Sequence, residues 1–328
     1  MKIFKILLIA GTIVLTFSLE AGMIFAGLTV KVVDENNVPI KDADATIIFS
    51  SPKLREWGTD QIEKKGKTDV NGIFSASAIN KDPLIGYVAK KDGYYHSADN
   101  LDLKKLDGNR WLPWNPTVTL VLKKKRNPGA MYAQRVEWIK VPVYDTPVGY
   151  DLEVGDWAAP YGKGKISDFV FTVNNRFQKW NDYESSCVLT FSNPHDGIQE
   201  FQFDPEDHSS YRWPFEAPEG GYLPELKKYS SSKPGEPIKQ NLYKEGKMNY
   251  IFRVRTQVDK NGNIIAAKYG KIKDDIIIFP NGNLGFLYFF NPDGTRNLEF
   301  DTYKNYFIPD EKKRHKSGYE KYDVWDAY

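Results

Sequence analysis

The clearest pattern of hydrophobic and polar positions lies between residues 250 and 301. Apolar or β-branched residues occupy every second position from Phe252 to Val258, with polar side chains between them. This period of two is typical of a strand with one buried face. Asn-Gly pairs at 261–262 and 281–282 predict tight turns, because both positions of such a pair tolerate positive φ. The pattern therefore predicts an antiparallel meander with strands at 252–258, 264–269, 276–279 and 284–290.

Strand character also dominates the rest of the chain. Residues 284–290 are apolar on both faces, which favours a central strand that is covered on each side. Further runs rich in β-branched and aromatic residues predict strands at 29–33, 45–49, 73–78, 86–90, 117–122, 168–173 and 187–191. The second half of the chain shows almost no helical period. The sequence therefore predicts an all-β protein with antiparallel sheets.

Three landmarks follow one another in the N-terminal third. The first is the strand, turn and strand of residues 30–48, the second is Gly66-Lys-Thr-Asp-Val-Asn-Gly-Ile-Phe74, and the third is Gly86-Tyr-Val-Ala-Lys-Lys-Asp-Gly-Tyr94. In order and spacing they resemble the carboxypeptidase regulatory-like (transthyretin-like) family, a non-catalytic module of many secreted proteins. The resemblance implies an N-terminal antiparallel β-sandwich and no activity of its own.

The sequence divides into two domains at Asn127-Pro-Gly129, a turn signal that follows the last strand of the sandwich. Residues 50–65 have no clear period and are interpreted as an insertion. Six prolines in residues 204–240 argue against regular structure there, and predict either an ordered excursion packed by aromatic rings or a mobile loop. The expected segments are a signal peptide (1–26), a carboxypeptidase regulatory-like β-sandwich (28–123), a larger antiparallel β domain (130–309) and a charged C-terminal tail (310–328).

The N-terminus has the order of a secretory signal peptide. Two lysines precede an apolar stretch over residues 6–19, and small residues follow it up to Ala26, the predicted cleavage site. Ala21 is a second candidate for cleavage. An uncleaved anchor is the alternative, because residues 6–26 are just long enough to cross a bilayer, although Glu20 interrupts them with a charge. Export with cleavage predicts a secreted or periplasmic protein with no stable membrane span.

Composition excludes some classes of protein. Hydrophobic residues make up 41% of the chain and aromatic residues 14%, which favours a globular over a disordered protein. The net charge of +2 is too small to predict a nucleic-acid partner. The single cysteine, Cys187, lies in a strand-like run and is interpreted as a buried thiol. An exported protein that cannot form an intramolecular disulfide fits a bacterial envelope better than a small disulfide scaffold.

The sequence identifies no catalytic or metal-binding motif. His96, His195, His208 and His315 share no spacing typical of a zinc site. The Gly-x-Ser-x-Gly turn of serine hydrolases is missing as well. We therefore predict no metal, no cofactor and no catalytic residue. The resemblance carries no peptidase activity, because the remaining chain lacks the zinc-ligand pattern of carboxypeptidases.

One loop, residues 150–164, concentrates acids beside aromatic rings. The candidate ligand-binding residues are Asp151, Glu153, Asp156, Trp157 and Tyr161. A second acidic loop spans residues 204–207. Carboxylates near exposed rings suit the binding or hydrolysis of glycans. The alternative is that both segments are ordered loops whose rings cap a β-core.

The sequence favours an exported, non-enzymatic binding or scaffolding protein of the bacterial envelope, with a polysaccharide or another envelope protein as its partner. The alternative is a glycoside-active hydrolase that uses paired carboxylates of the second domain, from residues 151–156 or 204–207. Hydrolysis needs two carboxylates that face each other across a cleft at roughly 5 to 9.5 Å. A binding module needs only exposed rings and hydrogen-bonding side chains.

Overall fold

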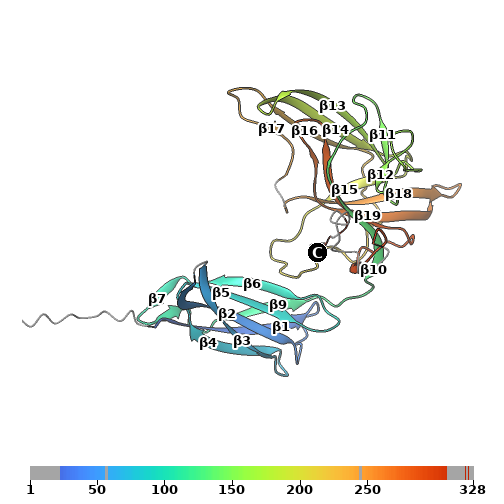
Figure 1. The fold of residues 1–328 in the computed structure, drawn as a ribbon. Helices are drawn as coiled ribbons and strands as arrows, with labels where there is room; N and C mark the ends of the chain where they lie inside the picture. The colour runs from blue at the N-terminus through green and yellow to red at the C-terminus, as the bar shows by residue number, and fades with distance from the viewer. Residues whose placement is uncertain (1–22, 56–57, 244–245, 309–321, 323, 325–328) are drawn as a thin grey trace, which may run out of the picture. The chain divides into compact units, whose positions relative to one another are not determined.

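The computed structural model describes residues 23–55, 58–243, 246–308, 322 and 324. These residues form 21 strands, β1 to β21, and no α-helix, which confirms the predicted all-β fold class. In the part of the chain so described, no helix is long and apolar enough to cross a membrane. The chain divides into two compact units (Figure 1). The first comprises residues 23–91 and Ser97–Leu122, and the second comprises Asp92–His96 and the chain from Lys123 onward.

The first unit is a β-sandwich of two sheets. One sheet contains β1 (Phe25–Asp34), β4 (Ile73–Ile79), β7 (Lys105–Asp107), β8 (Arg110–Leu112) and β9 (Thr117–Leu122). The other runs in the order β3 (Gly58–Lys67), β2 (Asp44–Arg55), β5 (Leu84–Lys90) and β6 (Ser97–Asp102). Alternate residues of β1, β2 and β9 are almost fully buried, among them Leu28, Val30, Ile47, Phe49 and Leu120. The period of two in the sequence thus supplies the core of this unit.

All five strands predicted in this unit are confirmed, since they lie within β1, β2, β4, β5 and β9. The interpretation of residues 50–65 as an insertion is wrong, because this stretch continues β2 and forms most of β3. β3 is an edge strand, and most side chains from Gln61 to Lys67 are exposed. A strand with so little buried surface has no hydrophobic period to reveal it. Membership of the carboxypeptidase regulatory-like family stays a prediction.

β1 begins before the predicted cleavage site. Phe25 and Ala26 pair with the last two residues of β4, and Ala26 is fully buried. Cleavage after Ala26 would therefore remove the start of a strand, whereas cleavage after Ala21 would leave the strand intact. The rest of the predicted signal peptide, residues 1–22, lies outside the described residues.

The second unit is a larger β-sandwich. Its first sheet runs in the order β15 (Gly197–Phe201), β18 (Asn249–Val258), β19 (Ile264–Ile278), β20 (Leu284–Asn291), β10 (Gly129–Ile139) and β21 (Phe300–Asn305). Its second sheet runs in the order β12 (Asp156–Trp157), β11 (Val148–Asp151), β13 (Phe169–Lys179), β14 (Asp182–Thr190), β16 (Leu226–Ser232) and β17 (Lys239–Gln240). Apolar side chains of both sheets form one core. Phe169 of β13, for example, packs edge-to-face on Phe252 of β18, with 5.0 Å between the ring centroids.

The predicted meander is confirmed as β18, β19 and β20. β20 is buried at every position and lies between β19 and β10, as predicted for a central strand. The two strands predicted at 264–269 and 276–279 are parts of the single strand β19. Pairing of β19 with β20 is irregular between Lys273 and Ile277, where Asp274 has a φ of 63°. This interruption explains why the hydrophobic pattern looks like two strands.

Residues 204–240 contain β16 and the short β17, which the sequence analysis does not predict. β16 buries Lys228, Ser230 and Ser232, so its inner face is polar and gives no hydrophobic period. Lys228 Nζ lies 2.8 Å from Asp275 Oδ1 of β19, and both side chains are almost fully buried. This ion pair joins the two sheets of the second unit.

The irregular part of the same stretch is ordered by its aromatic rings, as the first of the two alternatives predicts. Tyr211 and Trp213 are buried against Ile251 of β18. Lys271 Nζ lies 5.0 Å from the centroid of the Trp213 ring and donates to the carbonyl oxygen of Leu298 at 2.9 Å. The Lys271 side chain is fully buried. Burial lowers its pKa well below the usual value for lysine.

Of the predicted C-terminal tail, residues 310–328, the structure describes Tyr322 and Val324. Val324 is 1% exposed and packs in a cluster that includes Phe289 and Phe300. This residue of the tail is therefore part of the fold, and the rest of the tail lies outside the described residues.

Candidate functional site

The predicted acidic loop is held together by one of its own carboxylates. Asp151 Oδ1 accepts the backbone N–H groups of Glu153 and Val154 at 3.0 and 3.2 Å. Asp151 Oδ2 accepts those of Lys165 and Ile166 at 2.8 and 3.1 Å. The side chain is 2% exposed. Asp151 therefore fixes the course of the loop and offers no free oxygen to a ligand.

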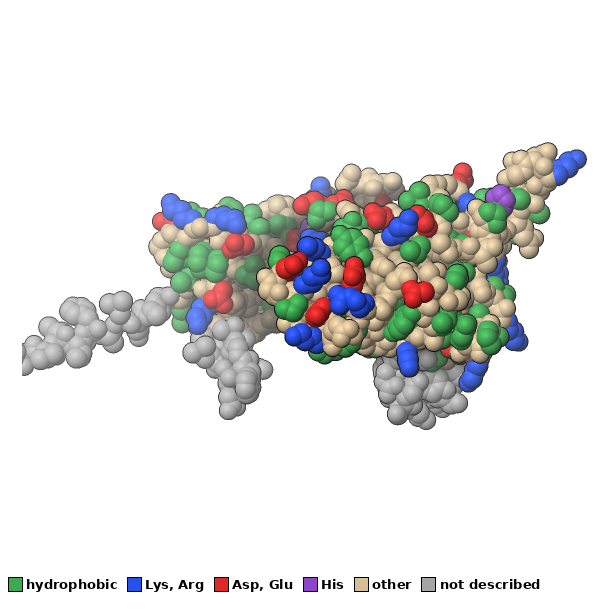
Figure 2. All heavy atoms as spheres, turned by 90° about the horizontal axis from the view of Figure 1, so that it is seen from above, with side chains coloured by type: hydrophobic (Ala, Val, Ile, Leu, Met, Phe, Trp, Pro, Cys, Tyr) green, Lys and Arg blue, Asp and Glu red, His purple; other side chains and the backbone are tan. Residues whose placement is uncertain are grey.

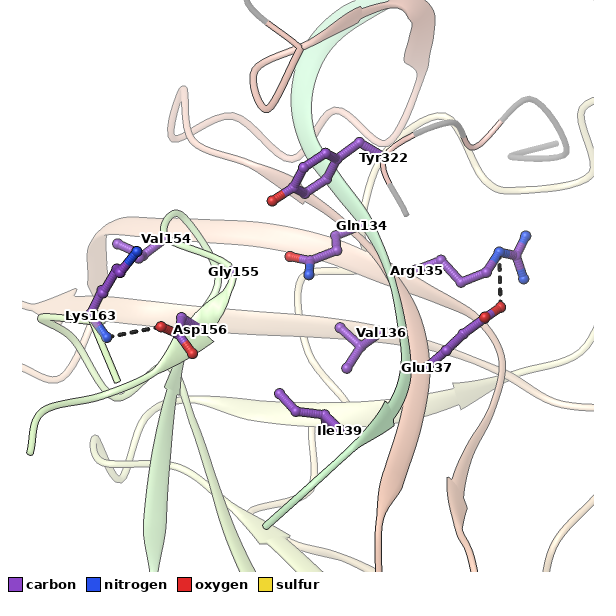
Figure 3. A pocket seen from close by; sticks show the side chains of 10 residues that line it. All are labelled: Gln134, Arg135, Val136, Glu137, Ile139, Val154, Gly155, Asp156, Lys163 and Tyr322. Atoms are coloured by element: carbon purple, nitrogen blue, oxygen red, sulfur yellow. Dashed lines mark hydrogen bonds and ion pairs between the residues drawn. The ribbon is translucent and has the colours of Figure 1, made fainter. Parts of the chain in front are cut away.

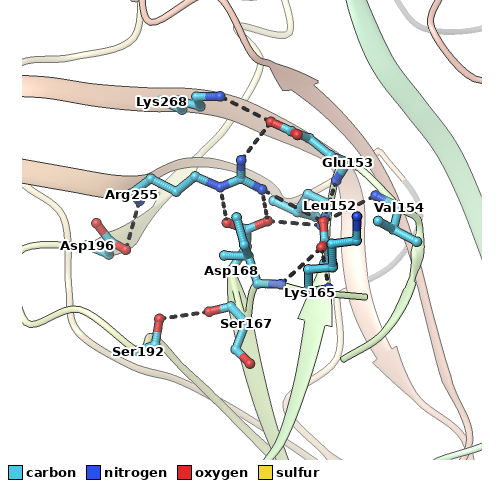
Figure 4. A network of polar contacts seen from close by, with 12 residues as sticks. Leu152, Glu153, Val154, Lys165, Ser167, Asp168, Ser192, Asp196, Arg255 and Lys268 are labelled. Carbon is cyan, nitrogen blue, oxygen red and sulfur yellow. Dashed lines mark hydrogen bonds and ion pairs between the residues drawn. The ribbon is translucent and has the colours of Figure 1, made fainter. Parts of the chain in front are cut away.

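Glu153 belongs to a polar network around Arg255 (Figure 4). Arg255 Nε and Nη2 donate to the two carboxylate oxygens of Asp168 at 2.7 and 2.9 Å. Arg255 Nη1 donates to Glu153 Oε1 at 2.6 Å, and Lys268 Nζ donates to the same oxygen at 3.1 Å. Burial raises the pKa of Asp168, although the guanidinium group of Arg255 opposes this shift by favouring the carboxylate. The predicted acid Glu153 thus has two cationic partners from β18 and β19.

The backbone of β18 is bulged at the centre of this network. Arg255 has a φ of 55°, and the pairing with β19 shifts between Val254 and Gln257. The carboxylate of Asp196 accepts the N–H groups of Arg255 and Thr256 at 3.0 and 2.9 Å. Asp196 thereby satisfies donors that the bulge takes out of the strand ladder. The network has a structural function, because it connects this bulge to the loop after β11.

Trp157 lies in the core of the second unit. The side chain is 4% exposed, and its indole ring packs edge-to-face on Tyr150 and Phe171. Trp157 Nε1 donates to the carbonyl oxygen of Lys140 at 3.1 Å. The ring therefore presents no open face on which a sugar could stack, which is the arrangement expected of the core-capping alternative.

The two remaining candidates are more accessible. Asp156 is partly buried, and its two oxygens accept the backbone N–H groups of Trp157 and Lys163 at 2.8 and 3.0 Å. Tyr161 is 46% exposed. The structure thus brings Asp151 and Glu153 together in one network, and places Trp157 in the core. A ligand-binding role of these residues stays a prediction.

The carboxylates of the second acidic loop also have partners within the protein. Asp204 Oδ1 accepts the N–H of Glu206 at 2.9 Å. Asp207 Oδ2 lies 2.6 Å from Lys123 Nζ, and Asp207 Oδ1 accepts the N–H of Ser209 at 3.1 Å. These bonds stabilise a turn and an ion pair.

A cavity of about 830 Å³ opens beside the acidic loop (Figure 3). Its wall is formed by β10, by residues 154–156 and Lys163, and by Tyr322. The charged and amide side chains of this wall are Gln134, Arg135, Glu137, Asp156 and Lys163. We call this space the polar cavity. Asp156 is the one of the five predicted site residues that lines the polar cavity.

The residues that β10 contributes to the polar cavity are not evident from the sequence. Gln134, Arg135 and Glu137 all line the polar cavity, yet they look like ordinary polar positions of a strand. In the folded protein Gln134 points toward Asp156 and Lys163, whereas Arg135 and Glu137 extend to the other side of β10 and pair with each other at 3.9 Å (Figure 3). No local signal in the sequence could have marked them as cavity residues.

Cys187 is buried in β14, and burial raises the pKa of its thiol to about 12, so the thiol is protonated at neutral pH. Among the residues that the structure describes, no group of three His, Cys, Asp or Glu side chains could hold a metal ion.

The surface carries charges of both signs. In Figure 2, basic and acidic side chains are mixed on the face that is shown. This distribution agrees with the net charge of +2.

No protein-family model and no curated protein matches the chain. Among solved structures, 3-chlorocatechol 1,2-dioxygenase from Rhodococcus opacus 1CP matches at 14% identity and a TM-score of 0.24, over 32% of this chain and 61% of its own length. A DUF3823 family protein from Parabacteroides merdae matches at 11% identity and a TM-score of 0.21, over 84% of this chain and 100% of its own. BcpA, the major pilin subunit of Bacillus cereus, matches at 10% identity and a TM-score of 0.23, over 83% of each chain. Similarities this low carry no argument about function.

Proposed function

We propose that this chain is an exported, non-enzymatic binding protein of the bacterial envelope, and that its polar cavity binds a polysaccharide. The observation that carries the proposal is the balance of charge on the cavity wall. Lys163 is cationic, Asp156 is anionic and Gln134 adds an amide, and the ion pair of Arg135 and Glu137 lines the cavity from the other side of β10. A sugar hydroxyl can donate to a carboxylate and accept from a cation, so a wall of this kind suits a neutral ligand with many hydroxyl groups.

The size of the polar cavity supports the same ligand class. Pockets that bind small organic molecules have volumes of roughly 300–1,000 Å³. The polar cavity, at about 830 Å³, lies in the upper part of this range. It has room for a segment of a glycan chain, whereas the mixed polar wall disfavours a purely apolar ligand.

The arrangement of the acids supports binding over hydrolysis. Asp151 accepts four backbone N–H groups, and Glu153 pairs with Arg255 and Lys268. A hydrolase needs one carboxyl group with a raised pKa as its acid and a second carboxylate facing it. The oxygens of Asp151 and Glu153 are taken up by partners within the protein, so they are less available to a substrate.

Export rests on the sequence. Two lysines, an apolar stretch over residues 6–19 and small residues up to Ala26 have the order of a signal peptide. A chain with a single cysteine needs no disulfide for its stability, which suits an envelope protein of bacteria. The resemblance to a module of secreted proteins points to the same compartment.

Binding of residues 22–328 to a panel of neutral and charged envelope polysaccharides tests the proposal. Arg135→Gln and Glu137→Gln should each weaken binding of a neutral polysaccharide about 5- to 10-fold, because a lost hydrogen bond contributes about 1 kcal/mol. Lys64→Gln, at an exposed position of β3, is the matched control and should bind like the wild type. Equal binding by all variants, or binding of no polysaccharide, would overturn the proposal.

A further inference from the structure

Trp138 of β10 lies at the surface because the backbone turns it outward. In a regular strand the side chain of Trp138 would lie on the same face as those of Gln134 and Val136, which are both buried. The pairing of β10 with β20 shifts between Val136 and Ile139, and Trp138 has a φ of 52°. As a result the Trp138 side chain is 49% exposed.

This conformation has a free-energy cost. A left-handed φ is unfavourable for an aromatic residue, because its Cβ atom approaches the following carbonyl oxygen. Such strain persists only where the surrounding structure holds it, and it clusters at functional sites. A bulge that exposes a tryptophan therefore calls for a function of the exposed ring.

Other aromatic rings gather around Trp138. Phe279 stacks on its indole, with ring centroids 3.8 Å apart and planes at 14°. Trp180 stands nearly perpendicular to Trp138 at 6.4 Å and 77°, and is 62% exposed. We call these three residues the aromatic platform. Trp138 forms a flat floor backed by Phe279, and Trp180 forms a wall at its side.

The aromatic platform is connected to the polar cavity through β10. Trp138 and Phe279 line a second cavity of about 350 Å³. Arg135 and Glu137 line this second cavity and the polar cavity alike. A ligand that leaves the polar cavity along β10 therefore reaches the platform past two side chains that can hydrogen-bond to it.

We propose that the aromatic platform is a second subsite for the same polysaccharide, which runs from the polar cavity across Arg135 and Glu137 onto Trp138. This inference rests on the proposed function. A pyranose ring has an apolar C–H face that stacks on the electron-rich face of an indole, and a rim of hydroxyl groups that can bond to the charged side chains. A proline-rich peptide would also stack on Trp138. It carries few donors for Glu137 and Asp274, which both line the second cavity, so the observations favour the sugar.

The decisive variant is Trp138→Gly in residues 22–328. Glycine adopts positive φ without strain, so this change removes the indole and keeps the bulge. We expect binding of a long oligosaccharide to weaken about 10- to 100-fold, by analogy with stacking of nucleic-acid bases on aromatic rings. Trp138→Tyr should restore part of the affinity, because it retains a ring. Trp114→Ala, at an exposed tryptophan of the first unit, is the control and should bind like the wild type.

Ligand length distinguishes the subsite from a merely structural role. Wild-type protein should bind long oligosaccharides more tightly than disaccharides, and Trp138→Gly should lose this difference while it still unfolds cooperatively and binds disaccharides like the wild type. If the wild type binds polysaccharide and Trp138→Gly binds it equally well, the subsite is overturned and the proposed function stands. If the chain binds no polysaccharide, or binds only a proline-rich peptide through Trp138, both proposals are overturned.

Discussion

Arg255 and Asp168 form a two-pronged ion pair between β18 and the residue that precedes β13, with N–O distances of 2.7 and 2.9 Å. The Asp168 side chain is completely buried, and that of Arg255 is 17% exposed. These strands belong to opposite sheets of the second unit. The pair therefore ties the two sheets together close to the loop in which the sequence predicts the ligand site.

Arg255→Met should lower the free energy of unfolding of the second unit by about 3–5 kcal/mol, because it leaves the buried carboxylate of Asp168 without its partner. Denaturant unfolding of the variant measures the loss. Adding Asp168→Leu should recover part of it, since the uncompensated charge is then removed. Lys239→Met, which breaks an exposed ion pair with Glu236, is the control and should cost less than about 1 kcal/mol. A loss as small as that of the control would show that the pair is structurally unimportant.

Trp157→Ala should destabilise the second unit by about 3–5 kcal/mol, because it deletes a buried indole from the core. Tyr161→Ala, at an exposed position of the same loop, should change stability by no more than about 0.5 kcal/mol. A thermal melt of each variant checks the difference. An unchanged melt for Trp157→Ala together with weaker glycan binding would instead restore Trp157 as a ligand-stacking residue.

Lys271 should make the stability of the second unit depend on pH. Burial lowers the pKa of this amine in the folded protein, so the unfolded chain binds more protons between the folded pKa and the unfolded value of about 10.4. Stability should therefore rise with pH through this window, by at most about 1.4 kcal/mol per pH unit. Lys271→Met, which keeps a long side chain among the aromatic rings, should remove this rise. Chemical denaturation at pH 7, 8 and 9 measures both slopes, and parallel slopes would contradict the assignment.

If the chain is exported as proposed, its mature form should begin at Gly22. Cleavage after Ala21 preserves β1, whereas cleavage after Ala26 would remove Phe25 and Ala26 from their pairing with β4. Mass spectrometry of the protein from its native envelope identifies the first residue. A chain that begins at Gly27 would show that the first residues of β1 are dispensable, and an intact Met1 in a membrane fraction would favour the uncleaved anchor.

Strands with one apolar face can be predicted from the sequence. Strands whose buried face is polar, or which bury few side chains, cannot. Phe252 and Val254 alternate with exposed or half-exposed positions, so β18 is evident from the pattern alone. β16 is hidden because its buried face carries Lys228, Ser230 and Ser232, which become acceptable in a core only through partners such as Asp275. Asp275 lies 47 residues after Lys228, so no local sequence pattern can reveal that the two residues pair.

The site is less predictable than the fold for the same reason. The acids of the loop after β11 are visible in the sequence. The two partners of Glu153 are not, because Arg255 and Lys268 come from distant strands. The exposure of Trp138 depends on a backbone angle, and its neighbours in sequence give no sign of it. Composition can locate acids and rings, whereas only the fold decides which of them face solvent.

The most direct test of the account is one titration with two readouts. Residues 22–328 are titrated by calorimetry with the polysaccharide that binds most tightly in the panel, and the same mixture is then assayed over time for newly formed reducing ends. We expect saturable binding and no reducing ends above those of the polysaccharide in buffer. Continuous release of reducing ends would show that the chain is a hydrolase and would contradict the claim that it acts by binding.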